Sequence, residues 1–195
     1  MQNKALFAIA AVFSLVTAAC AQPVVVLGSH DLRENASGQT IQIFVSGGDA
    51  VQGMNFNVQV ADGGPEAGAF GGTIDGPAIT NVDIFTGTIF ESNNTGQAGS
   101  GSIVPQVYHA ATTTSTGTVS ANGLLATITF DTTGFFFMDP VHSWDLVSSN
   151  TLNGPMDFGP IPATISDGTI NVVPEPASMA LLALGALAMI RRRKA

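Results

Sequence analysis

Apolar and polar residues alternate with a period of two in three segments of this chain, 41–45 (IQIFV), 54–60 (MNFNVQV) and 125–130 (LATITF). Because successive side chains of a β-strand point to opposite faces, this alternation predicts strands that bury one face and expose the other. Shorter apolar runs predict further strands at 24–27, 79–85, 88–90, 103–109, 135–138, 143–147 and 169–173.

Turn-forming pairs such as Gly-Gly, Asp-Gly and Asn-Gly separate the predicted strands. No segment between residues 22 and 172 has the 3.6-residue periodicity of a long helix. We therefore expect an all-β fold with a single antiparallel β-sandwich of the jelly-roll type. Its predicted core aromatics are Phe56, Phe130, Phe136 and Trp144.

The N-terminal segment has a different composition. It begins with a cation, Lys4, continues with an apolar stretch and ends in small residues, with Ala19 and Ala21 at the positions of a small-x-small cleavage site. This order predicts a secretory signal peptide at residues 1–21, which forms a helix and is removed. Residues 17–20 also resemble the lipobox of bacterial lipoproteins, which leaves lipidation of Cys20, the single cysteine, open.

The C-terminal segment, 173–195, has three parts: a proline-rich start, an uncharged apolar run at 177–190, and a final cluster of cations. At about 1.5 Å per residue the apolar run extends roughly 21 Å as a helix, short of the ~30 Å hydrocarbon core of a bilayer. It still predicts a transmembrane helix if the flanking arginines snorkel and the bilayer thins. The predicted cytoplasmic stop consists of Arg191, Arg192, Arg193 and Lys194.

This three-part arrangement resembles the PEP-CTERM sorting signal of Gram-negative bacteria, with Pro174, Glu175 and Pro176 as the signature tripeptide. The resemblance implies that an exosortase, a membrane-embedded cysteine protease or transpeptidase, cuts the chain near the tripeptide. It also implies export across the inner membrane, transient anchoring there, and final release to the cell surface or an extracellular matrix. Residues 1–21, 22–172 and 173–195 are thus the expected signal peptide, β-sandwich domain and sorting signal.

Once both signals are set aside, the central domain is strongly acidic. Between residues 22 and 172 one basic residue, Arg33, stands against thirteen acids, a formal net charge of −12. Phosphate backbones would repel such a domain, so a nucleic-acid partner is excluded. Divalent cations, neutral glycans and basic proteins remain compatible with it.

Two segments of the central domain resemble cohesin-like and carbohydrate-binding sandwich domains. Residues 50–58 follow an early x-G-x-x-F-x-V strand of those domains, and residues 123–130 follow a later G-x-L-A-x-I-x-F strand that pairs with it. Residues 165–172 resemble their final hairpin. The resemblance implies a fold, and it transfers no ligand to named residues.

Candidate catalytic chemistry is sparse. His30, His109 and His142 lie far apart in the sequence, without metal-ligand spacing, and there is no G-x-S-x-G motif. One hydrolytic cluster can be drawn, consisting of His142 with Asp139, Ser143 and Asp145. We expect these to be surface residues and predict no catalytic residue and no enzyme activity.

No cofactor is expected, although a structural Ca²⁺ is an alternative. Hard cations prefer several oxygen ligands, and the loops at 62–66 and 91–95, together with Asp75, supply carboxylates and amides. No segment has the spacing of an EF-hand loop, so the ligands of any such metal are unknown.

The sequence therefore predicts a secreted, exosortase-processed surface or extracellular-matrix protein with a non-catalytic, structural or adhesive β-sandwich. Its expected partners are the exosortase, the inner membrane and either exopolysaccharide or other surface proteins. A glycan-binding module is the main alternative, and an exposed Trp144 and Tyr108 would favour it. A secreted hydrolase is the other alternative.

Overall fold

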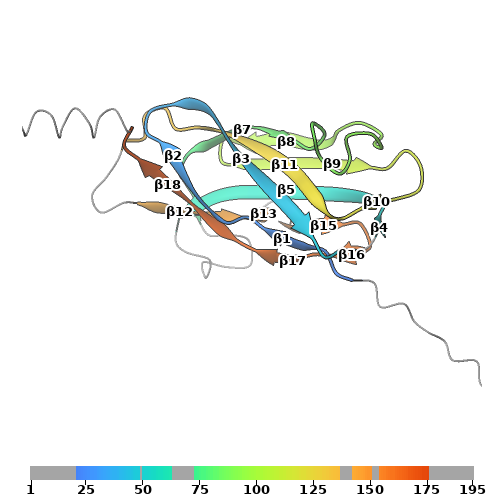
Figure 1. The fold of residues 1–195 in the computed structure, drawn as a ribbon. Helices are drawn as coiled ribbons and strands as arrows, with labels where there is room; N and C mark the ends of the chain where they lie inside the picture. Colours follow the sequence, from blue (N-terminus) through green and yellow to red (C-terminus); the bar gives the residue numbers. More distant parts are fainter. Residues whose placement is uncertain (1–20, 49, 63–72, 137–141, 151–153, 176–195) are drawn as a thin grey trace, which may run out of the picture.

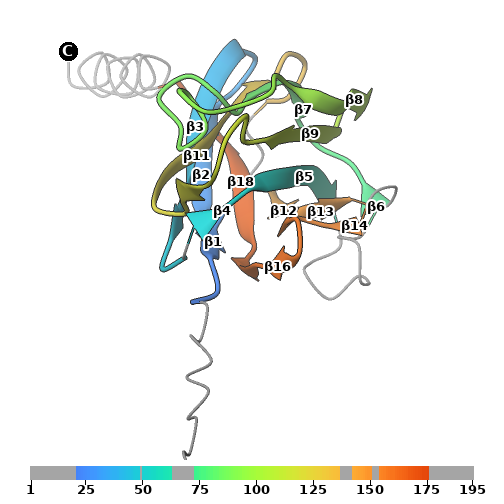
Figure 2. The same ribbon diagram turned by 90° about the vertical axis from the view of Figure 1, so that its right-hand side faces the viewer.

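The computed structural model describes residues 21–48, 50–62, 73–136, 142–150 and 154–175 (Figure 1). Within these ranges every regular element is a β-strand, and the strands form two layers (Figure 2). The predicted all-β sandwich is confirmed. The predicted signal-peptide helix and transmembrane helix lie outside the described residues. No helix long and apolar enough to cross a membrane occurs among the residues that were described.

The first sheet contains five strands, in the spatial order β17 (Thr164–Ser166), β1 (Val24–Val26), β3 (Ser37–Ser46), β11 (Gly123–Asp131) and β7 (Ala78–Asp83). Only the β1–β17 pair is parallel. The period-two pattern correctly predicts which face of β3 is buried. Ile41, Ile43 and Val45 are buried, and the residues between them are exposed.

The second sheet has β5 (Gly53–Asp62) at its centre. Its main path is β16 (Ile161–Pro162), β15 (Asp157–Phe158), β5, β12 (Ser143–Val147), β18 (Gly168–Val173) and β2 (Ser29–Arg33). Strands β6 (Thr73–Ile74) and β9 (Val107–Thr113) also pair with β5, and β8 (Ala98–Val104) pairs with β9. Two short ribbons complete the fold, β4 (Ala50–Val51) with β10 (Val119–Ser120) and β13 (Ser149–Asn150) with β14 (Gly154–Pro155).

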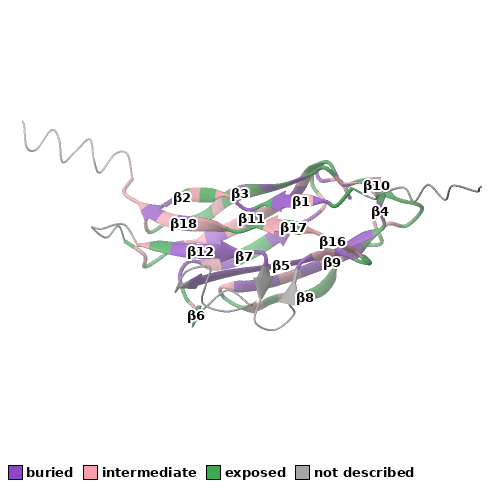
Figure 3. Ribbon diagram, turned by 90° about the horizontal axis from the view of Figure 1, so that it is seen from below, coloured by how far each residue is buried: buried purple, intermediate pink, exposed green. Residues whose placement is uncertain are grey.

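The core lies between the two sheets, and β5 and β12 are buried along most of their length (Figure 3). Phe56, Phe130 and Trp144 are buried, as predicted. Phe136 is not, since 60% of its side chain is exposed. The reason is that β11 ends at Asp131, so that Phe136 follows a turn and lies beyond the end of the sheet.

The strand predictions fail where a turn interrupts an apolar run. Residues 88–90 lie in the turns after β7 and are not a strand. The predicted strand 103–109 is the end of β8 and the start of β9, joined by a turn at Pro105 and Gln106. The sequence pattern also misses β2, because at this edge of the sheet only Leu32 is buried.

The predicted pairing of the two cohesin-like segments is wrong. β5, which contains 53–58, pairs with β9 and β12 in the second sheet, whereas β11 pairs with β3 and β7 in the first. The two strands therefore bury their apolar faces from opposite sheets. Residues 165–172 do not form a hairpin either, because β17 belongs to the first sheet and β18 to the second.

Two of the places where the chain passes from the first sheet to the second, from β1 to β2 and from β17 to β18, lie side by side. β1 and β17 are parallel neighbours in the first sheet, and their continuations β2 and β18 are parallel neighbours in the second. Two backbone hydrogen bonds join the crossings: the N–H of Leu27 donates to the carbonyl of Ser166 (2.9 Å), and that of Thr169 donates to the carbonyl of Gly28 (3.0 Å). We call this paired crossing the clasp.

Gly168 is the closest point of the clasp. A Cβ atom at this position would overlap the carbonyl oxygen of Gly28. Only glycine therefore lets the two backbones approach to hydrogen-bonding distance.

We predict that Gly168→Ala lowers the free energy of unfolding by about 3 kcal/mol, because the added methyl group forces the two backbones apart. Gly134→Ala is the matched control. A Cβ there meets nothing within 4 Å, and its φ of +86° makes the substitution cost only about 1 kcal/mol. Urea unfolding of residues 22–175 measures both. Equal midpoints for the two variants would show that the clasp tolerates a side chain.

Candidate functional site

The sorting tripeptide follows the last strand of the sandwich without a linker. β18 ends at Val173, and Pro174 and Glu175 come next, each half-buried. The carbonyl of Val173 accepts a hydrogen bond from the N–H of Glu34 (3.0 Å), which ties the start of the tripeptide to the end of β2. Pro176, the predicted stop residues Arg191–Lys194 and the predicted cleavage residue Ala19 lie outside the described residues, and Ala21 is the first described residue.

A buried threonine holds together the two loops that flank this exit. The Thr132 side chain has no exposed surface, and its hydroxyl lies 2.7 Å from the carbonyl of Arg33 and 2.8 Å from that of Ala36. The same hydroxyl accepts hydrogen bonds from the N–H of Ala36 and from the Gln39 side chain, both at 3.0 Å. The turn after β2 and the loop after β11 therefore form one unit.

Asn35 adds a second connection between these loops. Its φ of +46° is the only positive value among the described non-glycine residues. Its N–H donates to the carbonyl of Phe135 (2.9 Å), and its side-chain oxygen accepts the N–H of Gly134 (3.1 Å). Asparagine tolerates the left-handed region better than most residues, so the turn keeps this geometry at modest cost.

Glu34, Asn35, Phe136 and Glu175 line a hollow of about 240 Å³ beside the exit of the chain. We call these four residues the exit ledge. The ledge presents one exposed aromatic ring, one amide and two carboxyl groups, and one of the carboxyl groups belongs to the sorting tripeptide itself. An exposed aromatic ring beside carboxyl and amide groups suits contact with a protein partner.

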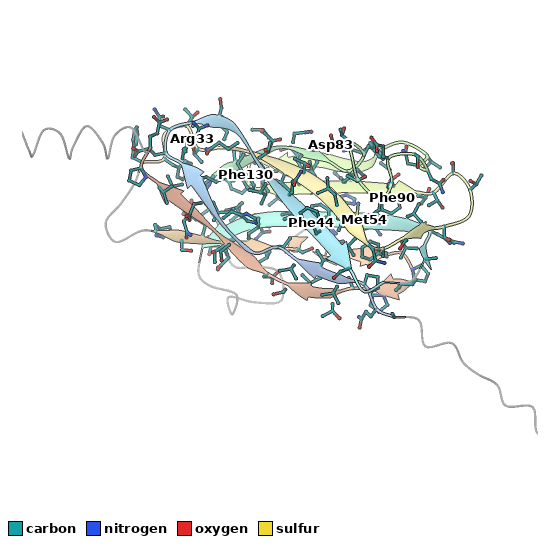
Figure 4. All side chains as sticks on the ribbon, viewed as in Figure 1. Arg33, Phe44, Met54, Asp83, Phe90 and Phe130 are labelled. Atoms are coloured by element: carbon teal, nitrogen blue, oxygen red, sulfur yellow. The ribbon has the colours of Figure 1, made fainter. Side chains whose placement is uncertain are left out.

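A second exposed feature lies on the outer face of the first sheet. Val26 is in register with Phe44 on β3, and Phe44 is in register with Leu124 on β11, so the three side chains form a row across adjacent strands. Val26 is 52% exposed, Phe44 is 54% exposed and Leu124 is half-buried. Phe44 is labelled in Figure 4. An exposed apolar row on the outer face of a sheet is typical of a protein-binding surface. We call it the cross-strand row.

Asp83 carries a negative charge at the edge of the same face, where it is in register with Thr127. Partial burial raises the pKa of Asp83, but hydrogen bonds from the side chain and N–H of Thr86 and from the N–H of Phe85 outweigh it. The two N–H groups lie 2.9 and 2.8 Å from the carboxylate. The net pKa is therefore below the ordinary 3.8, so the group remains ionised in mildly acidic solution.

A groove at one end of the second sheet is lined by threonine and serine residues together with glycines and apolar residues such as Met54 and Ala111. It consists of two adjoining hollows of about 430 and 300 Å³, which share Gly53, Thr113 and Gly159. Trp144 and Tyr108, the rings that would favour glycan binding if exposed, are instead 4% and 8% exposed. Phe158, the one aromatic residue in the lining, is also fully buried. The groove thus lacks the stacking surface expected of the glycan-binding alternative.

The three histidines make contacts with different neighbours. His30 on β2 bonds through Nε2 to the carbonyl of Leu27 (2.7 Å), and Nδ1 of His109 on β9 accepts the N–H of Ser100 (3.2 Å). The ring of His142 packs on Trp144 with centroids 4.5 Å apart. The hydrolytic cluster drawn from the sequence includes Asp139, which lies outside the described residues.

In the described part of the loops proposed for calcium, side-chain oxygens accept hydrogen bonds from backbone N–H groups. The side-chain oxygen of Asn93 accepts the N–H groups of Ser115 and Thr116, and that of Asn94 accepts the N–H of Gly96. The Asn93 and Asn94 side chains therefore hold the backbone of these loops in place. Within the described ranges no three His, Cys, Asp or Glu residues are grouped so that they could hold a metal ion. Residues 63–66 of the other loop lie outside those ranges.

We predict that Asp83→Asn destabilises the domain at pH 7 by less than about 1 kcal/mol, since the charged hydrogen bonds are partly exposed. A carboxylate whose pKa is lowered by folding stabilises the fold above its ordinary 3.8. That contribution to stability is lost as the pH falls through the lowered pKa of Asp83. The difference between the wild type and the variant should therefore disappear in strong acid. A gap in urea midpoint that stays constant from pH 7 to the acid limit would contradict this.

Comparison with known proteins assigns the two parts of the chain separately. Residues 172–194 match the family model of the PEP-CTERM protein-sorting motif. The chain matches none of the curated proteins. Among solved structures, the chain is similar to a type III cohesin module from the cellulosomal ScaE cell-surface anchoring scaffoldin of Ruminococcus flavefaciens. The TM-score is 0.50 and the sequence identity 15%, and the similarity covers 78% of this chain and 88% of the cohesin module.

A non-cellulosomal cohesin from the hyperthermophilic archaeon Archaeoglobus fulgidus is also similar, with a TM-score of 0.45 and 16% identity, over 82% of this chain and 97% of that one. At these identities the similarity concerns the fold alone. Both resemblances stated from the sequence are thereby confirmed: the chain is a cohesin-like β-sandwich that carries a PEP-CTERM protein-sorting motif at its C-terminal end.

Proposed function

We propose that this protein is exported across the inner membrane of a Gram-negative bacterium, anchored there by residues 177–190, and cut by an exosortase near Pro174–Pro176. The product is a non-catalytic β-sandwich, residues 22–172 with a short remnant of the tripeptide, that serves a structural or adhesive role at the cell surface or in the extracellular matrix. Residues 1–21 direct the export and are removed after Ala21.

The observation that carries this proposal is the direct junction between β18 and the tripeptide. Every strand among the described residues precedes Pro174, and the hydrogen bond from Glu34 reaches the carbonyl of Val173. A cut within or after the tripeptide therefore leaves all of the strand pairings in the released product. The first described residues of the domain and its last strand lie at opposite ends (Figure 1), so the removal of one signal does not obstruct the removal of the other.

The cross-strand row supports an adhesive role. It presents apolar side chains on the outer face of the first sheet with Asp83 at the edge, in a domain whose net charge is −12 over residues 22–172. Apolar surface combined with negative charge suits a basic protein partner better than an acidic polysaccharide. The groove at one end of the second sheet keeps neutral glycans as a weaker alternative, without an exposed ring among its described residues.

The sorting proposal is tested by replacing Pro174, Glu175 and Pro176 together with alanine. We expect the variant to accumulate in the inner-membrane fraction at its uncut size, because the exosortase no longer recognises it, while the wild type is released. The matched control replaces Thr114, Ser115 and Thr116, an exposed loop of the groove, with alanine and should be processed normally. Release of both variants in equal amounts would refute the sorting proposal.

The adhesive proposal is tested with the double variant Val26→Ser, Phe44→Ser. Loss of two central apolar contacts should weaken retention of the released domain by cells that lack their own copy, by about tenfold or more. Val104→Ser is the control, since Val104 is also partly exposed but lies on β8 of the second sheet. Binding of labelled protein to washed cells provides the measurement. If the double variant and the control bind alike, the cross-strand row is not the contact surface.

A further inference from the structure

We propose that the exit ledge is a second recognition element for the processing enzyme, in addition to the tripeptide. Phe136, Glu34 and Asn35 would contact the exported side of the exosortase while it grips Pro174–Pro176. The partner surface that fits the ledge is apolar with basic groups at its edge. This inference rests on the proposed processing by an exosortase, and the experiment below separates the failure of one from the failure of the other.

The sorting tripeptide lies beside the exit ledge because no linker separates it from β18. Glu175 is the last described residue and lines the hollow together with Phe136, and the predicted membrane segment begins at residue 177. Two residues span at most roughly 7 Å. An enzyme embedded in the membrane that reaches the tripeptide must therefore approach within contact distance of the ledge. A longer linker would have kept the domain away from the enzyme.

Phe136 lies beyond the end of β11 and outside the core. It is the most exposed of the large hydrophobic residues that were described, at 60%, although it lies only one residue after Phe135, which packs edge-on against Trp144 with ring centroids 5.4 Å apart. Backbone hydrogen bonds from Asn35 to Phe135 and from Phe135 to Thr132 hold the loop directly before the ring. Little backbone entropy of these residues is therefore lost when a partner covers Phe136.

The charges of the ledge favour a protein partner over the lipid surface. Glu34 and Glu175 both line the hollow, and the domain as a whole is strongly acidic. Anionic headgroups would repel these carboxylates, whereas basic side chains on an enzyme would complement them. Arg33, labelled at this end of the domain in Figure 4, is the single cation of residues 22–172 and does not reverse this balance.

The test follows conversion of the full-length precursor to product by pulse-chase labelling in cells that contain the exosortase. Phe136→Ser should slow conversion by about fivefold to tenfold, the loss expected when one central apolar contact is removed. Val104→Ser is the matched control, because Val104 is also an exposed apolar residue but lies on β8 and does not line the hollow. Glu34→Lys should also slow conversion, and Glu91→Lys, on an exposed loop, should not.

Contact is tested separately with the photoreactive residue benzoylphenylalanine in place of Phe136 or Val104 in the full chain. The proposal requires a covalent adduct between the precursor and the exosortase from position 136 and none from position 104. An adduct with lipid alone, or no enzyme adduct from position 136, would overturn it. Urea midpoints of purified Phe136→Ser and Glu34→Lys that match the wild type establish that slow conversion does not reflect misfolding.

The triple-alanine variant of the tripeptide separates the two hypotheses. If that variant is blocked while Phe136→Ser and Glu34→Lys are converted at the wild-type rate, the exit ledge plays no part in recognition and only this inference fails. If the triple-alanine variant is itself converted normally, the sorting proposal fails first. Slow conversion of the ledge variants together with the position-136 adduct supports the ledge as a second recognition element.

Discussion

The fold depends on the clasp, the parallel pairing of the first and last segments of the domain as they pass from one sheet to the other. β1 and β17 close an edge of the first sheet, and β2 and β18 continue the same pairing in the second. Two backbone hydrogen bonds and a glycine at the closest approach hold the crossing together. Because these contacts join residues more than 130 positions apart in sequence, neither sheet is complete until the chain has reached its last strand.

The clasp also determines where the sorting tripeptide lies. β18 is anchored along its whole length by β2, and the bond from Glu34 to Val173 continues that anchoring to the residue before Pro174. The signal is therefore presented at a fixed place on a folded surface. The exit ledge is formed by the turn after β2 and the loop after β11, two elements that reach this end of the domain only because the sheets are closed. Folding of the domain and the position of Pro174 therefore depend on the same pairing of β2 with β18.

Sequence reasoning succeeded where a residue's environment depends on its own neighbours. The alternation in 41–45, 54–60 and 125–130 predicted β3, β5 and β11, because one face of each strand is buried. The same pattern did not predict which strands pair with each other. β5 and β11 lie in different sheets, and residues 165–172 divide between two sheets. A period of two identifies the buried face of a strand and contains no information about which strand lies beside it. The edge strand β2 was missed for a related reason, since it buries little.

The sequence by itself determined the fold class, the acidity of the central domain and the sorting signal, because each depends on composition or on residues adjacent in the chain. Only the tertiary structure decided which aromatic rings are available to a partner. Trp144 and Tyr108 are enclosed between the sheets, whereas Phe136 lies beyond the end of β11. The cross-strand row likewise exists only through strand register, which aligns Val26, Phe44 and Leu124 from three distant segments. Exposure and register result from long-range packing, and no local pattern of residues specifies them.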